Sequence, residues 1–282
     1  MTARQVAAQA QAGREVARVI KFRASTALVL VVVSLVGLAA FTWPLFARPT
    51  GNANTAHAAD APWLFVLVLP LLIAVLLAEL ASGGIDSKAV AVLGVLTACG
   101  AALRLPGTGV TGFSPVFFLL IPAGRVLGRG FGFVLGALTM FVSALLTSGV
   151  GPWLPFQMFG AAWIGFFAGC LPPAKGKAEL LLLSAYGAVA GLAFGLLLDM
   201  WFWPFATQGL GDGVRFVPGG GLAANLQRFW AFHLATSFGF DIPRAVGNFL
   251  LVLLAGHPVL AALRRASRKA MFDATPIFDR SA

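Results

Sequence analysis

The chain has 282 residues, of which 59% are hydrophobic and 11% are charged, and its formal net charge is +10. A soluble domain of this size needs more charge to cover its surface, so the composition excludes an ordinary soluble protein and indicates a polytopic membrane protein. The apolar runs are long enough for helices and too long for barrel strands. The Lys and Arg residues gather at the ends of these runs, which argues against a nucleic-acid partner.

Eight apolar segments are each about long enough to cross a hydrocarbon core of roughly 30 Å. We therefore predict an all-α integral membrane protein, built as a bundle of about eight transmembrane helices. The fourth segment is short and contains Pro115 and Pro122, which predicts a kinked or partial crossing. The predicted spans are 25–47, 63–82, 87–105, 113–128, 130–149, 154–172, 179–204 and 240–263.

The distribution of positive charge predicts the orientation of these spans. With both termini in the cytoplasm, all but five of the 20 Lys and Arg residues fall on the inner side, which is the expected asymmetry. The segment 1–24 is either a basic helix on the inner leaflet or a frayed basic tail, and the sequence leaves both open. The longer outer segment, 205–239, turns from Gly-rich to aromatic, which predicts a short interfacial helix over 225–238 and a candidate lid.

The chain carries none of the usual enzyme signatures. It has no HExxH metal site, no GxSxG nucleophile elbow and no Walker A loop, and its three histidines are scattered. We therefore expect no catalysis, no metal and no cofactor.

Small residues recur at four-residue spacing in several spans, which lets helix backbones approach closely in lipid. Gly94, Ala98 and Ala102 share one face of the span 87–105, and a register through Ala91 is the alternative. Either packing within the bundle or docking against another membrane subunit explains such a stripe. The other stripes are Gly132 and Gly136, Gly165 and Gly169, and Gly187, Gly191 and Gly195.

Charges of both signs converge on the predicted outer side, which indicates a polar pocket rimmed by aromatic residues and suited to a small organic ligand. Helix capping and snorkelling are the simpler explanation for each charge alone. Asp241 in "FDIPRAVGNFLL" is expected to cap the last span, with Arg244 facing either a ligand or an acidic partner such as Asp199. The predicted binding residues are Arg104, Trp153, Gln157, Asp199, Trp201, Trp203, Trp230, Asp241 and Arg244.

Two stretches carry a family resemblance, "GFSPVFFLLIPAGRVLGRGFGFVLGALTMFVSALLTSGVGPWLPFQMFGAAWIGFFAGCLP" and "DIPRAVGNFLLVLLAGHPVLAALRR". They resemble the substrate-binding S components of energy-coupling factor (ECF) transporters, of the actinobacterial vitamin-uptake type. The resemblance implies a six-helix substrate-binding core over 87–265, preceded by two additional helices over 25–86 and followed by a cytoplasmic tail, 266–282.

The resemblance also implies a function and a set of partners. A water-soluble vitamin, with cobalamin as the first choice, is captured at the outer face of a bacterial plasma membrane. It is then delivered through a transmembrane coupling subunit that two cytoplasmic ATPases drive, with Gly94, Ala98 and Ala102 as the docking stripe. A self-sufficient secondary transporter or channel for a small organic solute is the alternative, although the sequence lacks midplane charges and an evident inverted repeat.

Overall fold

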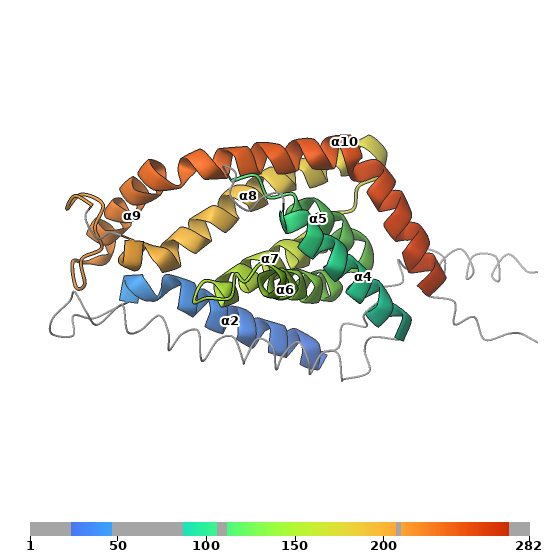
Figure 1. Ribbon diagram of the computed structural model, residues 1–282, viewed down its shortest axis with the longest axis horizontal. Coiled ribbons are helices and arrows are strands. Elements are labelled where there is room, and N and C mark those ends of the chain that lie inside the picture. Colours follow the sequence, from blue (N-terminus) through green and yellow to red (C-terminus); the bar gives the residue numbers. More distant parts are fainter. Residues whose placement is uncertain (1–23, 47–86, 106–111, 207–209, 271–282) are drawn as a thin grey trace, which may run out of the picture.

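The structure is a computed structural model, which describes residues 24–46, 87–105, 112–206 and 210–270. Within these ranges every regular element is an α-helix and no strand occurs, so the all-α prediction is confirmed for the described part of the chain (Figure 1). The predicted span 63–82, most of the segment 1–24 and the end of the tail lie outside the described residues.

Seven of the eight predicted spans coincide with helices whose first residues lie within three positions of the prediction, and the predicted interfacial helix forms as α9. The last span continues further than expected, into the predicted tail. The helices are α2 (Ala24–Phe46), α4 (Ser87–Arg104), α5 (Val116–Leu127), α6 (Arg129–Leu146), α7 (Leu154–Ala168), α8 (Gly176–Ala206), α9 (Leu222–Thr236) and α10 (Phe238–Ala270).

Three of the described helices are long and apolar enough to cross a membrane: α6, α8 and α10. Large apolar side chains point outward from α8 and α10, where Val189 is 63% exposed and Leu254 is 78% exposed. Soluble monomers rarely expose large apolar surfaces to water, whereas membrane proteins expose them to lipid. These outer faces therefore support a membrane setting. The described part of the chain is therefore all-helical and has the properties of a membrane bundle.

Helix α5 forms the centre of the bundle. It contacts α4, α6, α7, α8 and α10, and all but two of its 12 residues are buried. A helix of this length extends about 18 Å, which is shorter than a hydrocarbon core. The prediction of a partial crossing for 113–128 agrees with this short, enclosed helix, in which Pro122 is buried.

Glycines bring α6 and α7 into backbone contact. A Cβ added to Gly165 would overlap the carbonyl of Gly132, and a Cβ added to Gly132 would overlap the carbonyl of Gly165. Gly136 lies in the same way on the backbone of Ala161. Small residues at this spacing allow such close crossings, so these predicted stripes serve packing within the bundle.

The glycine stripe of α8 faces α10, and the two helices run antiparallel. Gly187 lies beside Asn248, a Cβ on Gly191 would be 3.2 Å from the Cα of Ala245, and Gly195 lies against the carboxylate of Asp241. We call this contact the α8–α10 seam. It places the start of α10 beside the later part of α8, where α9 joins them.

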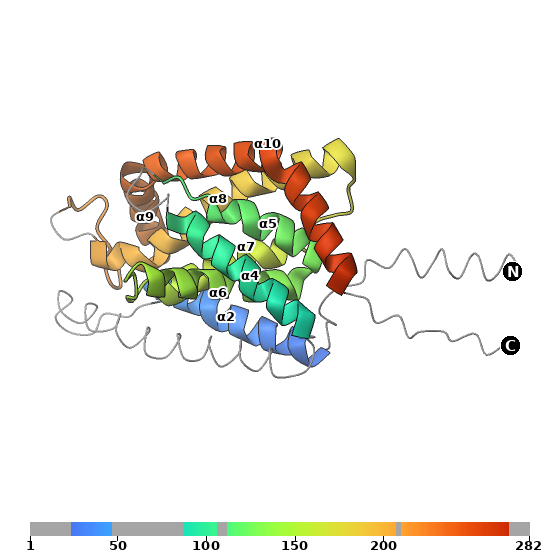
Figure 2. The same cartoon turned by 45° about the vertical axis from the view of Figure 1, so that its right-hand side comes forward.

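Helix α2 and helix α10 lie on opposite sides of the bundle (Figures 1 and 2). Helix α2 packs against α7 through Phe41, which makes an edge-to-face contact with Phe156, and through Gly37, which lies on the ring of Phe159. Beyond α8, a smaller apolar cluster closes the α9 side of the molecule, formed by Trp203, Phe216, Phe229 and Phe232.

Candidate functional site

The side chains of Asp199, His233, Asp241 and Arg244 form a buried polar cluster between α8, α9 and α10, which we call the Asp241 cluster. His233 Nδ1 lies 2.6 Å from Asp199 Oδ2, and His233 Nε2 lies 3.6 Å from Asp241 Oδ2. Arg244 donates to Asp241 Oδ1 and to the carbonyl of Gly191. One imidazole therefore stands between two carboxylates, and the second of these is paired with an arginine.

The sequence explains how these groups meet. On α9, Asn225, Phe229 and His233 recur every four residues and all are buried, so the histidine occupies the face that packs inward. On α8, Gly195 has no side chain, which leaves room for the carboxylate of Asp241. The same periodicity could have identified His233, which sequence reasoning left aside as a scattered histidine.

The prediction for the start of α10 differs from the structure in its details. Helix α10 begins at Phe238, and the carbonyl of Ser237 accepts from the amides of Phe240 and Asp241. The Asp241 carboxylate consequently points to Arg244 and His233 instead of capping the helix. Arg244 pairs with Asp241, and it is His233 that engages Asp199.

A second polar group forms around Arg104 at the end of α4. Its Nη2 donates to Gln157 Oε1 at 2.5 Å, and its Nη1 donates to Ser143 Oγ at 3.3 Å and to the Met140 carbonyl at 3.5 Å. These bonds join α4, α6 and α7. Within the described ranges, no hydrogen bond or ion pair connects this group to the Asp241 cluster, so the predicted charged residues fall into two separate hydrogen-bonded groups.

The four predicted tryptophans divide into two kinds. Trp201 and Trp203 are packing residues: Trp201 lies edge-on to Phe156, and Trp203 is fully buried and donates to the Val214 carbonyl at 2.7 Å. Trp153 and Trp230 are each 46% exposed. The ring centroid of Trp230 is 5.8 Å from that of His233, so this exposed ring borders the Asp241 cluster.

Two buried acceptors lie on the side of α10 that faces the bundle. Asp241 Oδ2 and Asn248 Oδ1 accept no hydrogen bond from the residues that the structure describes, although His233 Nε2 is 3.6 Å from Asp241 Oδ2. An unsatisfied buried acceptor costs about 1–3 kcal/mol, so this face is suited to receive donors from water or from a ligand.

The opposite end of the seam carries a cluster that the sequence did not predict. Glu179 has 3% of its side chain exposed and binds Arg125 Nε at 3.0 Å and Arg264 Nη2 at 2.6 Å. Arg125 also donates to the Leu171 carbonyl, which follows α7. The end of α7 therefore lies beside the Glu179 cluster, and the start of α7, with Gln157, lies toward the opposite end of the bundle. Sequence reasoning treated Arg125 and Arg264 only as markers of topology, although Glu179 was an acidic residue among basic ones.

The two ends of the seam are separated by the same distance on both helices. Glu179 and Asp199 on α8 are 20 residues apart, as are Arg244 and Arg264 on α10, and no Asp, Glu, Lys or Arg lies between them. At 1.5 Å per residue each interval spans about 30 Å, which is the thickness of a hydrocarbon core. The charges therefore lie where two membrane surfaces would be.

The predicted docking stripe lies on an open face. Gly94, Ala98 and Ala102 are all exposed on α4, and a Cβ added to Gly94 would meet no atom of the described residues within 4 Å. The other face of the helix is buried, including Leu93 and Ala101. Among the described small-residue stripes, this one differs because it faces outward.

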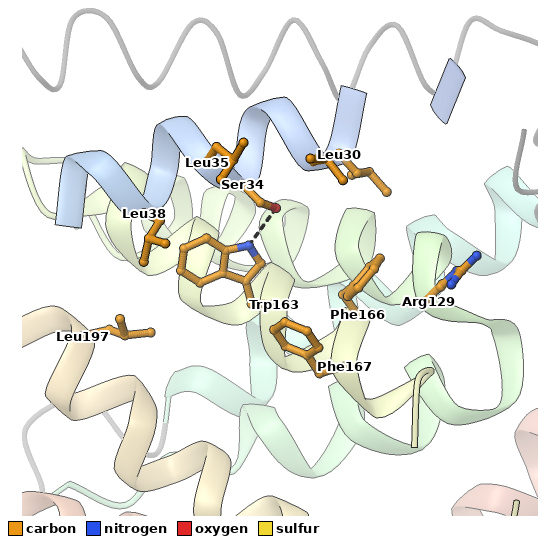
Figure 3. A pocket seen from close by; sticks show the side chains of 10 residues that line it. Leu30, Ser34, Leu35, Leu38, Arg129, Trp163, Phe166, Phe167 and Leu197 are labelled. Carbon is orange, nitrogen blue, oxygen red and sulfur yellow. Dashed lines mark hydrogen bonds between the residues drawn. The ribbon is translucent and has the colours of Figure 1, made fainter. Parts of the chain in front are cut away.

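A cavity of about 610 Å³ lies between α2 and the helices α7 and α8 (Figure 3). Trp163 contributes to its wall and donates to Ser34 Oγ at 3.0 Å, and Arg129 lies at one end. None of the predicted ligand-binding residues lines it.

The chemistry available at the Asp241 cluster is hydrogen bonding, charge pairing and proton exchange. In the part of the chain that the structure describes, no group of three or more His, Cys, Asp or Glu side chains is arranged to hold a metal ion. Searches of protein-family models, curated proteins and solved structures returned no match to this chain.

Proposed function

We propose that this chain is the substrate-binding S component of an ECF-type importer, with about eight spans in a bacterial plasma membrane. It captures a water-soluble vitamin at the outer face and delivers it through a transmembrane coupling subunit that two cytoplasmic ATPases drive. The observation that carries the proposal is the outward-facing stripe of Gly94, Ala98 and Ala102 on α4.

Helix association in lipid depends on packing, because lipid chains are as apolar as the side chains themselves. An exposed stripe of small residues allows another helix backbone to approach closely. The glycines of α6, α7 and α8 already have partners inside the bundle, whereas the α4 stripe offers its surface to a second protein. A coupling subunit that binds within the membrane is a partner that would use such a surface.

The Asp241 cluster is the proposed ligand site. It combines charged groups of both signs, two buried acceptors to which no described residue donates and the exposed ring of Trp230. A few polar anchors beside an aromatic surface suit an organic ligand that carries hydrogen-bond donors. Cobalamin is the first compound to test.

The basic residues support a cytoplasmic position for the end of the bundle that carries the Glu179 cluster. Beside the Glu179 cluster, this end carries the exposed side chains of Lys175, Lys177, Arg265 and Arg268. Cytoplasmic loops carry an excess of Lys and Arg. The Asp241 cluster then faces outward, and both termini are cytoplasmic.

Co-expression with a coupling subunit and two ATPases tests the proposal. Ala98→Trp should abolish co-purification and ATP-dependent uptake of cobalamin, while binding of the vitamin to the isolated chain is retained. Val189→Trp is the matched control, since Val189 is exposed on α8 and outside the stripe. Unchanged co-purification of the Ala98→Trp protein would contradict the proposed docking face.

Ligand contact at the Asp241 cluster predicts a separate pattern. Arg244→Ala should weaken ligand binding at least tenfold, which corresponds to about 1.4 kcal/mol and is the loss expected for a charge-assisted hydrogen bond. Arg215→Ala is the control, because Arg215 is exposed and its ion pair is with the exposed Asp212. Mass spectrometry of compounds that co-purify with the protein identifies the ligand directly.

A secondary transporter is the second candidate, and the buried Asp199–His233–Asp241 arrangement favours it. Chains of Asp and His inside membrane proteins often relay protons. A chain that works in this way would accumulate its solute in proteoliposomes under a proton gradient without ATP, and His233→Gln would abolish that uptake. An S component shows no such activity alone.

A further inference from the structure

The cavity between α2 and α7 offers very little to a water-soluble ligand. Apart from Ser34 and Arg129, every lining residue in the described part of the chain is hydrophobic. The hydroxyl of Ser34 is already bonded to the indole of Trp163 at 3.0 Å. The volume of the cavity, about 610 Å³, is within the roughly 300–1,000 Å³ of ordinary ligand sites, so the cavity can hold a sizeable apolar group.

The cavity opens along the bundle surface and is not enclosed by it. Leu35 and Phe167, from its two walls, are 61% and 52% exposed. Helix α2 touches α7 at a few places, such as Gly37 on Phe159 and Ser34 on Trp163, and a groove remains between them. In a bilayer such a groove is open to lipid chains.

Charge marks one end of the groove. Arg129 and Leu197 lie at opposite ends in the view of Figure 3, and Arg129 is the charged lining residue. Arg129 is also the first residue of α6, where the helix dipole places partial positive charge. Four positions earlier, Arg125 binds Glu179, so Arg129 belongs to the basic end of the bundle.

We propose that this groove binds one anionic phospholipid, with an acyl chain along α2 and α7 and the phosphate at the guanidinium of Arg129. Apolar length with a cation at one end complements such a lipid, and basic pockets between membrane helices bind anionic head groups. The lipid enters from the leaflet at the Glu179 end, which is the inner leaflet in the proposed topology. It would hold α2 against the core where direct contacts between α2 and α7 are few.

Brominated lipids test this inference, since bromine quenches the fluorescence of a nearby tryptophan. The full chain is reconstituted in phosphatidylcholine vesicles that contain increasing amounts of phosphatidylglycerol with brominated acyl chains. We expect a component of quenching that saturates at low phosphatidylglycerol content and is missing in Trp163→Phe. The other six tryptophans supply the background that both proteins share.

Two matched arginine variants test whether lipid binding requires the charge of Arg129. Arg129→Gln should weaken the saturable component about fivefold, the effect of one basic residue on an anionic lipid, whereas Arg265→Gln should leave it unchanged. Arg265 is exposed, belongs to the same basic end and does not line the cavity. Val31→Phe, which fills part of the groove without adding a tryptophan, should weaken or remove the saturation, and circular dichroism verifies that each variant is folded.

Three results would overturn the proposal. Equal quenching by brominated phosphatidylcholine would mean that lipid contacts Trp163 without head-group selection. Equal affinity of the wild-type and Arg129→Gln proteins would remove the phosphate contact. Absence of any quenching that depends on Trp163 would mean that another part of the chain covers the groove.

Discussion

The α6–α7 crossing and the outer face of α4 carry small residues at the same four-residue spacing, but they meet different surroundings. At the crossing, Gly132 and Gly165 each lie on the other's backbone. On α4, no atom of the described part of the chain lies within 4 Å of the position where a Cβ on Gly94 would be, and Ala98 is exposed. The spacing shows that a close approach is possible, and the neighbouring helix decides whether the bundle uses it.

This difference separates two roles that the sequence left open. A closed stripe, which packs against a neighbouring helix, contributes to stability, because a larger side chain in it forces the two backbones apart. An open stripe, which is exposed on the surface of the bundle, contributes nothing to the stability of the isolated chain and is available to a partner. Substitutions in the two stripes should therefore affect different measurements.

The largest effect is expected at the closed crossing. Gly165→Leu should lower the free energy of unfolding by about 3 kcal/mol or more, because its Cβ alone overlaps the Gly132 carbonyl and no side chain can move aside. Gly94→Leu is the matched substitution on α4 and should not lower the free energy of unfolding; the higher helix propensity of leucine should raise it by up to about 1 kcal/mol. Unfolding in mixed detergent micelles measures both, and similar losses would remove the distinction between the stripes.

A smaller loss is expected where charge closes the α8–α10 seam. Glu179→Gln leaves Arg125, whose side chain is 12% exposed, without its anion, and should cost about 2–3 kcal/mol of unfolding free energy. Arg264 is 48% exposed and can recover hydration, which keeps the loss at the lower end of what a buried pair gives.

The control for Glu179 is the exposed pair Asp212–Arg215, with an N–O distance of 3.0 Å. Asp212→Asn should cost no more than about 0.5 kcal/mol, since water already screens that pair. If Glu179→Gln cost as little, the Glu179 cluster would be an ordinary surface pair and the seam would be held by glycine packing alone.

Much of the fold could be predicted from the sequence, because long apolar runs and their charged ends follow directly from the hydrophobic effect. The starts of α8 and α10 lie within three residues of the predicted spans. The tertiary partners were harder to predict. Asp241 pairs with Arg244 one turn away, and His233 reaches Asp199 only because α9 folds back beside α8.

The Asp241 cluster and the groove show what a single sequence does not contain. Trp203 and Trp230 are both aromatic residues near the predicted outer side, yet one is fully buried and the other is 46% exposed. The cavity depends on the distance between α2 and α7, which hydrophobic periodicity does not specify. Spacing along one helix predicts faces, whereas the gap between two helices depends on every side chain that lies there.

The smallest effect on stability is expected at Ala98, on the open face. Ala98→Leu should change the unfolding free energy of the isolated chain by less than about 0.5 kcal/mol, because the added atoms extend away from the bundle. The same substitution should weaken binding of a coupling subunit, since a larger side chain keeps the partner's backbone away. A clear loss of stability in the isolated chain would mean that this face is packed against the protein itself. The α4 stripe would then be a third closed crossing, and the comparison with Gly165 would no longer identify a docking surface.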